Sequence, residues 1–144
     1  MVAPDIKVAL IGCGRIAGHH CGSLAVVDGI SLAAVCDLDI AKANAYAQQF
    51  DVPAFDDYRK MLTDIPDIQI AAIITPSGMH FEHGMEIIES FGKNIVVEKP
   101  TFMRPDHLNT IWNAATQNDL KLFPVFQNRY NKAVRRVRKG IEDG

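Results

Sequence analysis

Apolar residues along this chain fall into short continuous runs, and longer segments between them carry apolar residues at every third or fourth position. Continuous apolar runs predict strands buried on both faces, and the helical spacing predicts amphipathic helices. We expect strands at 8–11, 31–36, 51–55, 67–75, 94–97 and 121–126. We expect helices at 16–27, 39–50, 56–62, 77–90, 105–118 and 130–142.

This alternation of strands and helices is typical of an α/β protein with a parallel sheet covered on both faces. Right-handed crossovers would make it a Rossmann-type, doubly wound domain of about six strands. The 144 residues suffice for one such domain. The residues expected to point into its core from the helices include Ile40, Ala43, Ala47, Phe50, Phe81, Met85, Ile88 and Trp112.

A glycine-rich turn follows the first apolar run. Gly12, Gly14 and Ala17 stand at the spacing of the dinucleotide-binding fingerprint. In that motif the first glycine permits a tight turn, the second lets a pyrophosphate approach the backbone, and the third small residue lets the helix pack on the sheet. Free N–H groups at the start of the helix would face the phosphates. Small residues also recur in turns by chance, so this pattern needs support from the rest of the chain.

An acidic residue supplies that support at the end of the second expected strand. Asp37 directly follows the run 31–36, which is where the fingerprint expects a carboxylate that binds the adenosine ribose. The carboxylate would repel a 2′-phosphate, so NAD is the expected cofactor rather than NADP. The alternative is that Asp37 only caps the helix that starts near Asp39.

Polar clusters also follow the fourth, fifth and sixth expected strands, at 75–77, 98–100 and 127–131. The carboxyl ends of parallel strands meet at one edge of the sheet, where such folds bind ligands. A lysine buried there beside a cofactor has a lowered pKa and can relay a proton during alcohol oxidation, which makes Lys99 a candidate. A cis peptide at Pro100 could fix its aim. The alternative for Lys99 is a side chain that reaches from the strand end to solvent.

At these residues the chain resembles the Gfo/Idh/MocA family of oxidoreductases, which includes glucose–fructose oxidoreductase and inositol dehydrogenase. Four motifs carry the resemblance: Gly-Cys-Gly-Arg-Ile-Ala at 12–17, Asp37, Thr-Pro-Ser-Gly-Met-His at 75–80 and Glu-Lys-Pro at 98–100. The last motif is the most specific, because a glycine fingerprint alone also fits a methyltransferase or a short-chain dehydrogenase.

The resemblance implies roles for individual residues. Lys99 would be the catalytic residue, near the carbon that gives or receives hydride, and would contact the substrate together with Asn128 and Arg129. Glu98 would hydrogen-bond near the nicotinamide ribose, and His80 would help to close the cofactor groove. The full set of implied cofactor-binding residues is Gly12, Gly14, Arg15, Ile16, Asp37, Thr75, Pro76, Ser77, His80, Glu98, Lys99 and Gln127.

The resemblance also implies a domain organisation. Residues 1–126 would form the NAD(P)-binding domain, and 127–144 would be a strip and helix leading to a C-terminal α/β substrate domain that this chain lacks. In the family that second domain supplies a histidine as general acid/base, most of the substrate pocket and the sheet used for dimerisation. We therefore expect a fragment, inactive alone, of a homo-oligomeric NAD(P)-dependent dehydrogenase that acts on CH–OH groups of a sugar, cyclitol or nucleotide sugar. The alternatives are a non-catalytic NAD(H) sensor and an S-adenosylmethionine methyltransferase.

Composition and charge weigh against other classes of protein. A net charge of −2 offers no attraction to nucleic acid, and no apolar stretch is long enough to span a membrane. Three cysteines without C-x-x-C spacing fit a reducing cytoplasm. No metal site is expected, because His80 and His83 lack a third ligand. The basic stretch 132–139 is expected to be a solvated helix face or one that docks on the missing domain, and His19 and His20 are expected to have solvent or packing roles.

Overall fold

The computed structural model describes residues 5–144, and its strands form one six-stranded sheet in the order β3-β2-β1-β4-β5-β6. Every neighbouring pair of strands is parallel. The strands are β1 (Ile6–Ile11), β2 (Ile30–Cys36), β3 (Ala54–Phe55), β4 (Ile70–Ile73), β5 (Asn94–Val97) and β6 (Leu122–Pro124). The predicted doubly wound parallel sheet of about six strands is confirmed.

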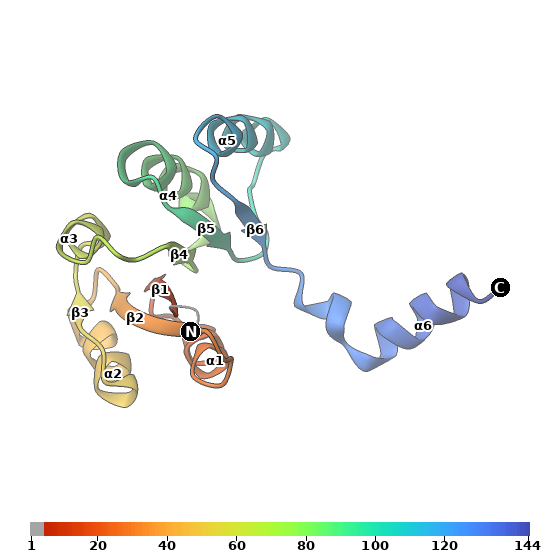
Figure 1. Cartoon of the computed structure of the whole chain (residues 1–144), viewed down its shortest axis with the longest axis horizontal. Coiled ribbons are helices and arrows are strands. Elements are labelled where there is room, and N and C mark those ends of the chain that lie inside the picture. Colours follow the sequence, from red (N-terminus) through yellow and green to blue (C-terminus); the bar gives the residue numbers. More distant parts are fainter. Residues whose placement is uncertain (1–4) are drawn as a thin grey trace.

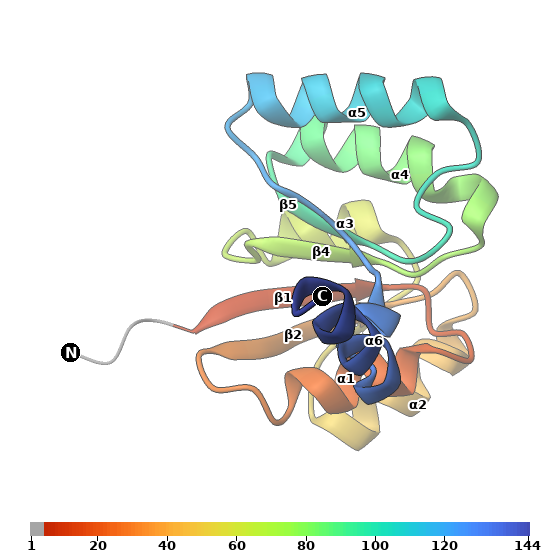
Figure 2. The same ribbon diagram turned by 90° about the vertical axis from the view of Figure 1, so that its right-hand side faces the viewer.

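Helices cover both faces of this sheet. The helices are α1 (Ala17–Leu24), α2 (Ile40–Phe50), α3 (Tyr58–Asp64), α4 (His80–Glu86), α5 (Pro105–Gln117) and α6 (Lys132–Glu142). Figure 2 shows α1 and α2 below the sheet and α4 and α5 above it, and Figure 1 shows α3 on the same side as α4 and α5. A 3-10 turn, Ser77–Met79, leads into α4, and a π-helical segment, Ile87–Phe91, extends that helix.

The alternation of side chains along β1 explains why its apolar run is continuous. Ala9 and Ile11 pack in the core under α3, α4 and α5, whereas Val8 and Leu10 pack in the core under α1 and α2. Successive residues of a strand point to opposite faces, so a strand covered by helices on both faces has no position left for a polar side chain.

Several expected positions differ from the structure. Trp112 was expected in the core and is 58% exposed, so this prediction is wrong. The buried stripe of α5 is made of Ile111, Ala114 and Ala115 instead, and Trp112 lies outside it. Ile40 is also 42% exposed, because it is the first residue of α2.

The first helix is shorter than expected, since it ends at Leu24 and not at residue 27. Val26 is 80% exposed and Val27 is 49% exposed. A further helical turn at 25–27 would therefore bury little apolar surface. Such burial is what usually stabilises the last turn of a helix.

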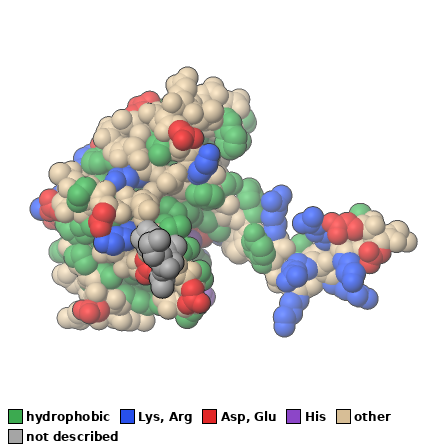
Figure 3. Space-filling view, in the orientation of Figure 1, with side chains coloured by type: hydrophobic (Ala, Val, Ile, Leu, Met, Phe, Trp, Pro, Cys, Tyr) green, Lys and Arg blue, Asp and Glu red, His purple; other side chains and the backbone are tan. Residues whose placement is uncertain are grey.

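The C-terminal helix projects away from the sheet. A 3-10 turn, Gln127–Tyr130, follows β6, and the side chain of Asn131 caps α6 by accepting a 2.9 Å hydrogen bond from the N–H of Ala133. Every residue of α6 is exposed. Lys and Arg side chains gather over this projection (Figure 3). No helix within residues 5–144 has both the length and the apolar character that a membrane span requires.

Candidate functional site

The glycine-rich turn after β1 is shaped by close contact with the end of β4. Gly12 adopts φ +103°, and a Cβ at this position would lie 2.9 Å from backbone atoms of Ile74 and Thr75. Only glycine adopts this conformation at no cost in so little space. Gly14 differs, because no atom lies within 4 Å of where its Cβ would be. Its backbone is thus open to a ligand at the start of α1.

Asp37 joins the end of β2 to this turn. Its Oδ2 accepts a 2.7 Å hydrogen bond from the N–H of Cys13, and its Oδ1 accepts a 2.9 Å bond from the N–H of Asp39. Asp39 is itself the cap of α2, since its carboxylate accepts from the N–H of Ala41. The alternative interpretation of Asp37 as the helix cap is therefore wrong. Each carboxylate oxygen keeps a second lone pair for a ligand hydroxyl.

A groove of about 780 Å³ runs along the ends of β1, β2 and β4. Five of the predicted cofactor-binding residues line it: Gly12, Gly14, Asp37, Thr75 and Pro76. Of the other predicted residues, Ser77 is half-buried in the 3-10 turn before α4, and Arg15 is exposed at the start of α1.

The far wall of the groove comes from α3 and α4, which no motif identified. Arg59 donates to both carboxylate oxygens of Glu86, from Nε at 2.5 Å and from Nη2 at 2.7 Å. The hydroxyl of Tyr58 donates to the same carboxylate. Burial and this hydrogen bond raise the pKa of Tyr58, and burial together with Arg59 lowers the pKa of His83. Two rings that are neutral at pH 7 and a paired guanidinium therefore form this wall.

These wall residues lie far from the fingerprint in the sequence. The ring of Tyr58 is 5.0 Å from that of His83, centroid to centroid, and Nδ1 of His83 is 3.2 Å from the Thr75 hydroxyl. Tyr58 directly follows Asp57, the residue that caps α3, and this signal marks a helix start and no ligand. The spacing of His83 from His80 pointed at most to a metal and not to this wall.

His80 does not line the groove, in contrast to its expected role in closing it. Its side chain is 1% exposed. Nε2 lies 2.8 Å from the carbonyl oxygen of Thr75, and Nδ1 lies 3.1 Å from that of Pro100 and 3.2 Å from that of Thr101. The imidazole thus connects the loop after β4 with the loop after β5. It contacts the backbone carbonyl of Thr75, whereas His83 contacts the hydroxyl of the same residue.

A second cavity, of about 390 Å³, lies beside α1 at the ends of β5 and β6. It brings together three predicted residues, Ile16, Glu98 and Gln127. Glu98 is only 7% exposed, its Oε2 accepts a 2.8 Å bond from the N–H of Lys99, and its Oε1 lies 2.9 Å from Nε2 of His20. His20 was expected to have a solvent or packing role, so this contact was missed.

The charge of Glu98 is maintained despite its burial. Burial alone would raise the pKa of this carboxyl, but the hydrogen bonds from His20 and from the backbone of Lys99 hold the pKa below its ordinary value. A nearly buried carboxylate is stable only with such donors.

Lys99 directly follows Glu98, just after the end of β5. Its peptide bond to Pro100 is cis, as expected. The side chain of Lys99 is exposed in this chain, whereas the expected proton relay needs a lysine buried beside a bound cofactor. It lies at the end of β5, where a strand covered by helices on both faces emerges into solvent.

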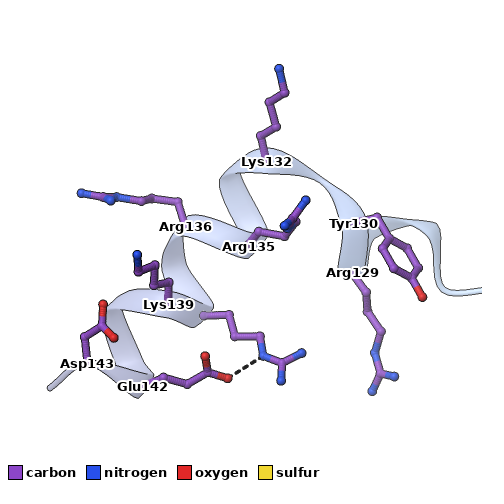
Figure 4. A pocket seen from close by; sticks show the side chains of 9 residues that line it. Arg129, Tyr130, Lys132, Arg135, Arg136, Lys139, Glu142 and Asp143 are labelled. Atoms are coloured by element: carbon purple, nitrogen blue, oxygen red, sulfur yellow. Dashed lines mark hydrogen bonds and ion pairs between the residues drawn. The ribbon is translucent and has the colours of Figure 1, made fainter.

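The predicted substrate residues lie on the projecting segment. Asn128 and Arg129 are exposed in the turn before α6, and the Arg129 guanidinium lies 5.6 Å from the ring centroid of Phe126. Arg129 shares an open surface with side chains of α6, where Arg138 and Glu142 form a 2.7 Å ion pair (Figure 4). Gln127, which directly precedes these two residues, lines the cavity that also contains Glu98.

The residues present fit a dinucleotide. The strand order reverses between β1 and β4, which creates the crevice in which doubly wound sheets bind nucleotides. The open backbone at Gly14 and the start of α1 suit a pyrophosphate, and the Asp37 carboxylate suits a ribose diol. Gly12 and Gly14 of this turn line the groove, and Ile16 and His20, which follow the turn, line the second cavity, so two separate spaces adjoin this segment.

Comparison with known proteins points to the same chemistry. The family model described as "Oxidoreductase family, NAD-binding Rossmann fold" matches residues 6–126. The D-glucoside 3-dehydrogenase of Escherichia coli (strain K12) is 26% identical, and the match covers 100% of this chain and 41% of that protein. The scyllo-inositol 2-dehydrogenase (NADP(+)) IolW of Bacillus subtilis (strain 168) is 25% identical, over 96% of this chain and 38% of that protein.

Among solved structures, the WlbA dehydrogenase from Bordetella pertussis, in complex with NADH and UDP-GlcNAcA, is similar with a TM-score of 0.90 and 30% sequence identity. That match covers 97% of this chain and 42% of the WlbA chain. This chain spans about two fifths of the length of the curated relatives it matches. By its fold, its strand-end motifs and the family model over 6–126, the chain belongs to the Gfo/Idh/MocA family of oxidoreductases, with an NAD-binding Rossmann fold.

Proposed function

We propose that this chain is the NAD-binding part of a dehydrogenase that acts on the CH–OH group of a sugar, cyclitol or nucleotide sugar. The observation that carries the proposal is the groove in which Asp37 faces the open turn at Gly14. The substrate class is supported by the relatives, whose names include glucoside and inositol dehydrogenases and whose WlbA member was solved with a nucleotide sugar.

The preference for NAD over NADP rests on the charges around the groove. Asp37 would accept hydrogen bonds from the free ribose hydroxyls and repel a 2′-phosphate. The two cations that line the groove already have partners: Lys42 lies 3.4 Å from Asp39, and Arg59 is paired with Glu86. Within the described residues, the groove therefore offers no unpaired cation for a 2′-phosphate.

In the proposed reaction, bound NAD supplies a nicotinamide carbon that takes up or releases hydride. The chain itself would orient this cofactor and supply one proton-carrying group, the side-chain Nζ of Lys99, whose backbone N–H donates to the Glu98 carboxylate. Lys99 is exposed here. Its desolvation would therefore have to come from substrate or from protein outside residues 5–144.

We further propose that residues 1–126 form the cofactor domain and that 127–144 lead to a substrate domain. Such a domain would cover the exposed side chains of Asn128, Arg129 and α6, and would be the surface through which the whole protein forms homo-oligomers.

Burial raises the pKa of Cys13 to about 12 and of Cys21 to about 11. Unreactive, unpaired thiols are compatible with the proposed cytoplasmic location.

Calorimetric titration of this chain with NADH, NADPH and S-adenosylmethionine tests the proposal. We expect NADH to bind more tightly than NADPH, and S-adenosylmethionine not to bind. Preferential binding of S-adenosylmethionine would support the methyltransferase alternative. A protein that includes the substrate domain and binds NADH, yet turns over no polyol or sugar, would instead be an NAD(H) sensor.

A further inference from the structure

His20 and Glu98 are in contact beside the end of β5, although 78 positions separate them in the sequence. His20 comes from α1, which starts at the glycine-rich turn, and Glu98 directly follows β5. Nε2 of His20 lies 2.9 Å from Oε1 of Glu98, and the two side chains are 19% and 9% exposed. The helix expected to face the pyrophosphate thus also contacts the carboxylate at the other end of the crevice.

The direction of this hydrogen bond follows from the chemistry of its partners. An ionised carboxylate only accepts, so Nε2 of His20 carries the proton and donates. Oε2 of Glu98 accepts from the N–H of Lys99. Each carboxylate oxygen therefore has one protein donor, which holds the plane of the carboxylate in one orientation. Without His20, Oε1 would be nearly buried and without this donor.

The position of the pair relative to a bound dinucleotide follows from the sheet. Asp37 lies on the β2 side of the glycine-rich turn, so the adenosine half occupies the groove there. The pyrophosphate lies over the turn, and the other nucleoside half must extend toward β5 and β6. The cavity on that side is lined by Glu98, His20 and Gln127 among others.

We propose that His20 is a positioning residue for the nicotinamide-riboside half of the cofactor. It acts through Glu98: by donating to Oε1, it keeps the carboxylate ionised and aimed so that its remaining lone pairs accept from ribose hydroxyls. The same contact sets the start of the loop that carries Lys99. This inference rests on the proposed NAD-binding function and adds a residue to it.

A structural role and a positioning role for His20 make different predictions. If His20 only stabilised the fold, its loss would weaken every nucleotide to the same extent. If it positions Glu98, its loss weakens NADH, which has a nicotinamide riboside, and leaves ADP unaffected. ADP occupies only the groove and the glycine-rich turn, so it serves as the matched ligand.

The experiment compares wild type, His20→Phe and His20→Gln by calorimetry with NADH and with ADP. Phe keeps a flat ring and removes the donor, whereas Gln keeps an N–H near the position of Nε2. We expect His20→Phe to weaken NADH roughly 10-fold or more while ADP changes less than about 2-fold. We expect His20→Gln to restore NADH binding to within about 3-fold of wild type.

Equal weakening of NADH and ADP in His20→Phe, or no weakening of either, would overturn the positioning role. A wild-type chain that binds neither ligand would instead contradict the proposed function itself. If His20→Phe does not fold, imidazole ¹H–¹⁵N spectra of the wild type decide the question. We expect the Nε2–H signal of His20 to shift on addition of NADH and not of ADP, and a signal that responds to neither would also overturn the role.

Discussion

The Asp37 carboxylate accepts a 2.7 Å hydrogen bond from the backbone N–H of Cys13. The residue expected to select the ribose is therefore attached to the turn expected to bind the pyrophosphate. Two parts of one motif, separated by 24 positions, hold each other in place.

This contact sharpens the prediction for Asp37→Ala. The substitution removes the acceptors for the ribose hydroxyls, so we expect NAD to bind more weakly by about 1.5–3 kcal/mol. NADP should lose less, because the repulsion of its 2′-phosphate disappears together with the carboxylate. Titration with both cofactors measures this change, and an unchanged NAD/NADP affinity ratio would contradict it.

Asp37→Asn provides the matched control. Asn keeps an oxygen that can accept from Cys13, removes the negative charge, and loses the acceptor for the N–H of Asp39. We expect it to destabilise the turn less than Ala does and to raise the affinity for NADP relative to NAD. If Asn and Ala lower the stability of the domain equally, the contact with Cys13 contributes little to the turn.

Gly12→Ala should destabilise the fold as well as the site. Its φ of +103° and the 2.9 Å approach of a Cβ to the backbone of Ile74 leave no room for a side chain. We expect a loss of about 2–4 kcal/mol in the free energy of unfolding, measured with urea. Gly22→Ala is the control, because nothing lies within 4 Å of that Cβ position in α1, and it should be neutral or slightly stabilising.

His80→Ala should lower stability, because the imidazole bonds to carbonyl oxygens of two different loops. The substitution leaves a cavity and carbonyl groups without partners, which costs about 2–4 kcal/mol in free energy of unfolding. His19→Ala, at an exposed position of α1, should change it by less than about 0.5 kcal/mol. A His80→Ala protein with normal stability but weak NADH binding would show that the ring acts on the ligand instead.

Lys99→Met is expected to separate catalysis from binding in a protein that includes the substrate domain. If Nζ moves a proton, turnover should fall roughly 100-fold or more while cofactor affinity stays near normal. Lys60→Met, which removes an exposed ammonium from α3, should leave both quantities unchanged. A parallel loss of turnover and affinity for Lys99→Met would make this lysine a cofactor-binding residue.

Because Glu98 is a buried carboxylate, we expect the free energy of unfolding to depend on pH. Its pKa is lower in the folded chain than its ordinary value of about 4.5, so its ionised form contributes stability above that pH. The contribution is lost as pH falls through the folded-state pKa. We expect the difference in unfolding free energy between wild type and Glu98→Gln to shrink as pH falls below about 4.5. A difference that stays constant with pH would contradict this assignment.

The order of strands and helices was predictable from the sequence because a strand buried on both faces requires a continuous run of apolar residues. Residues 8–11 are all apolar since neighbouring residues of β1 enter two different cores. Helix ends were less predictable. The end of α1 and the exposure of Trp112 depend on which side of a helix meets the sheet, and α5 offers apolar residues on more than one side.

The motif residues at the strand ends were also predictable, since Gly12, Asp37 and Glu98 combine unusual residue types with fixed positions after strands. Only the tertiary structure decided what these residues contact. In the folded chain Glu98 contacts His20, His80 lies outside the groove, and Tyr58 and His83 form the far wall of the groove. The physical reason is that a strand or helix leaves a periodic pattern in neighbouring residues, whereas a contact between distant segments depends on the packing that brings them together.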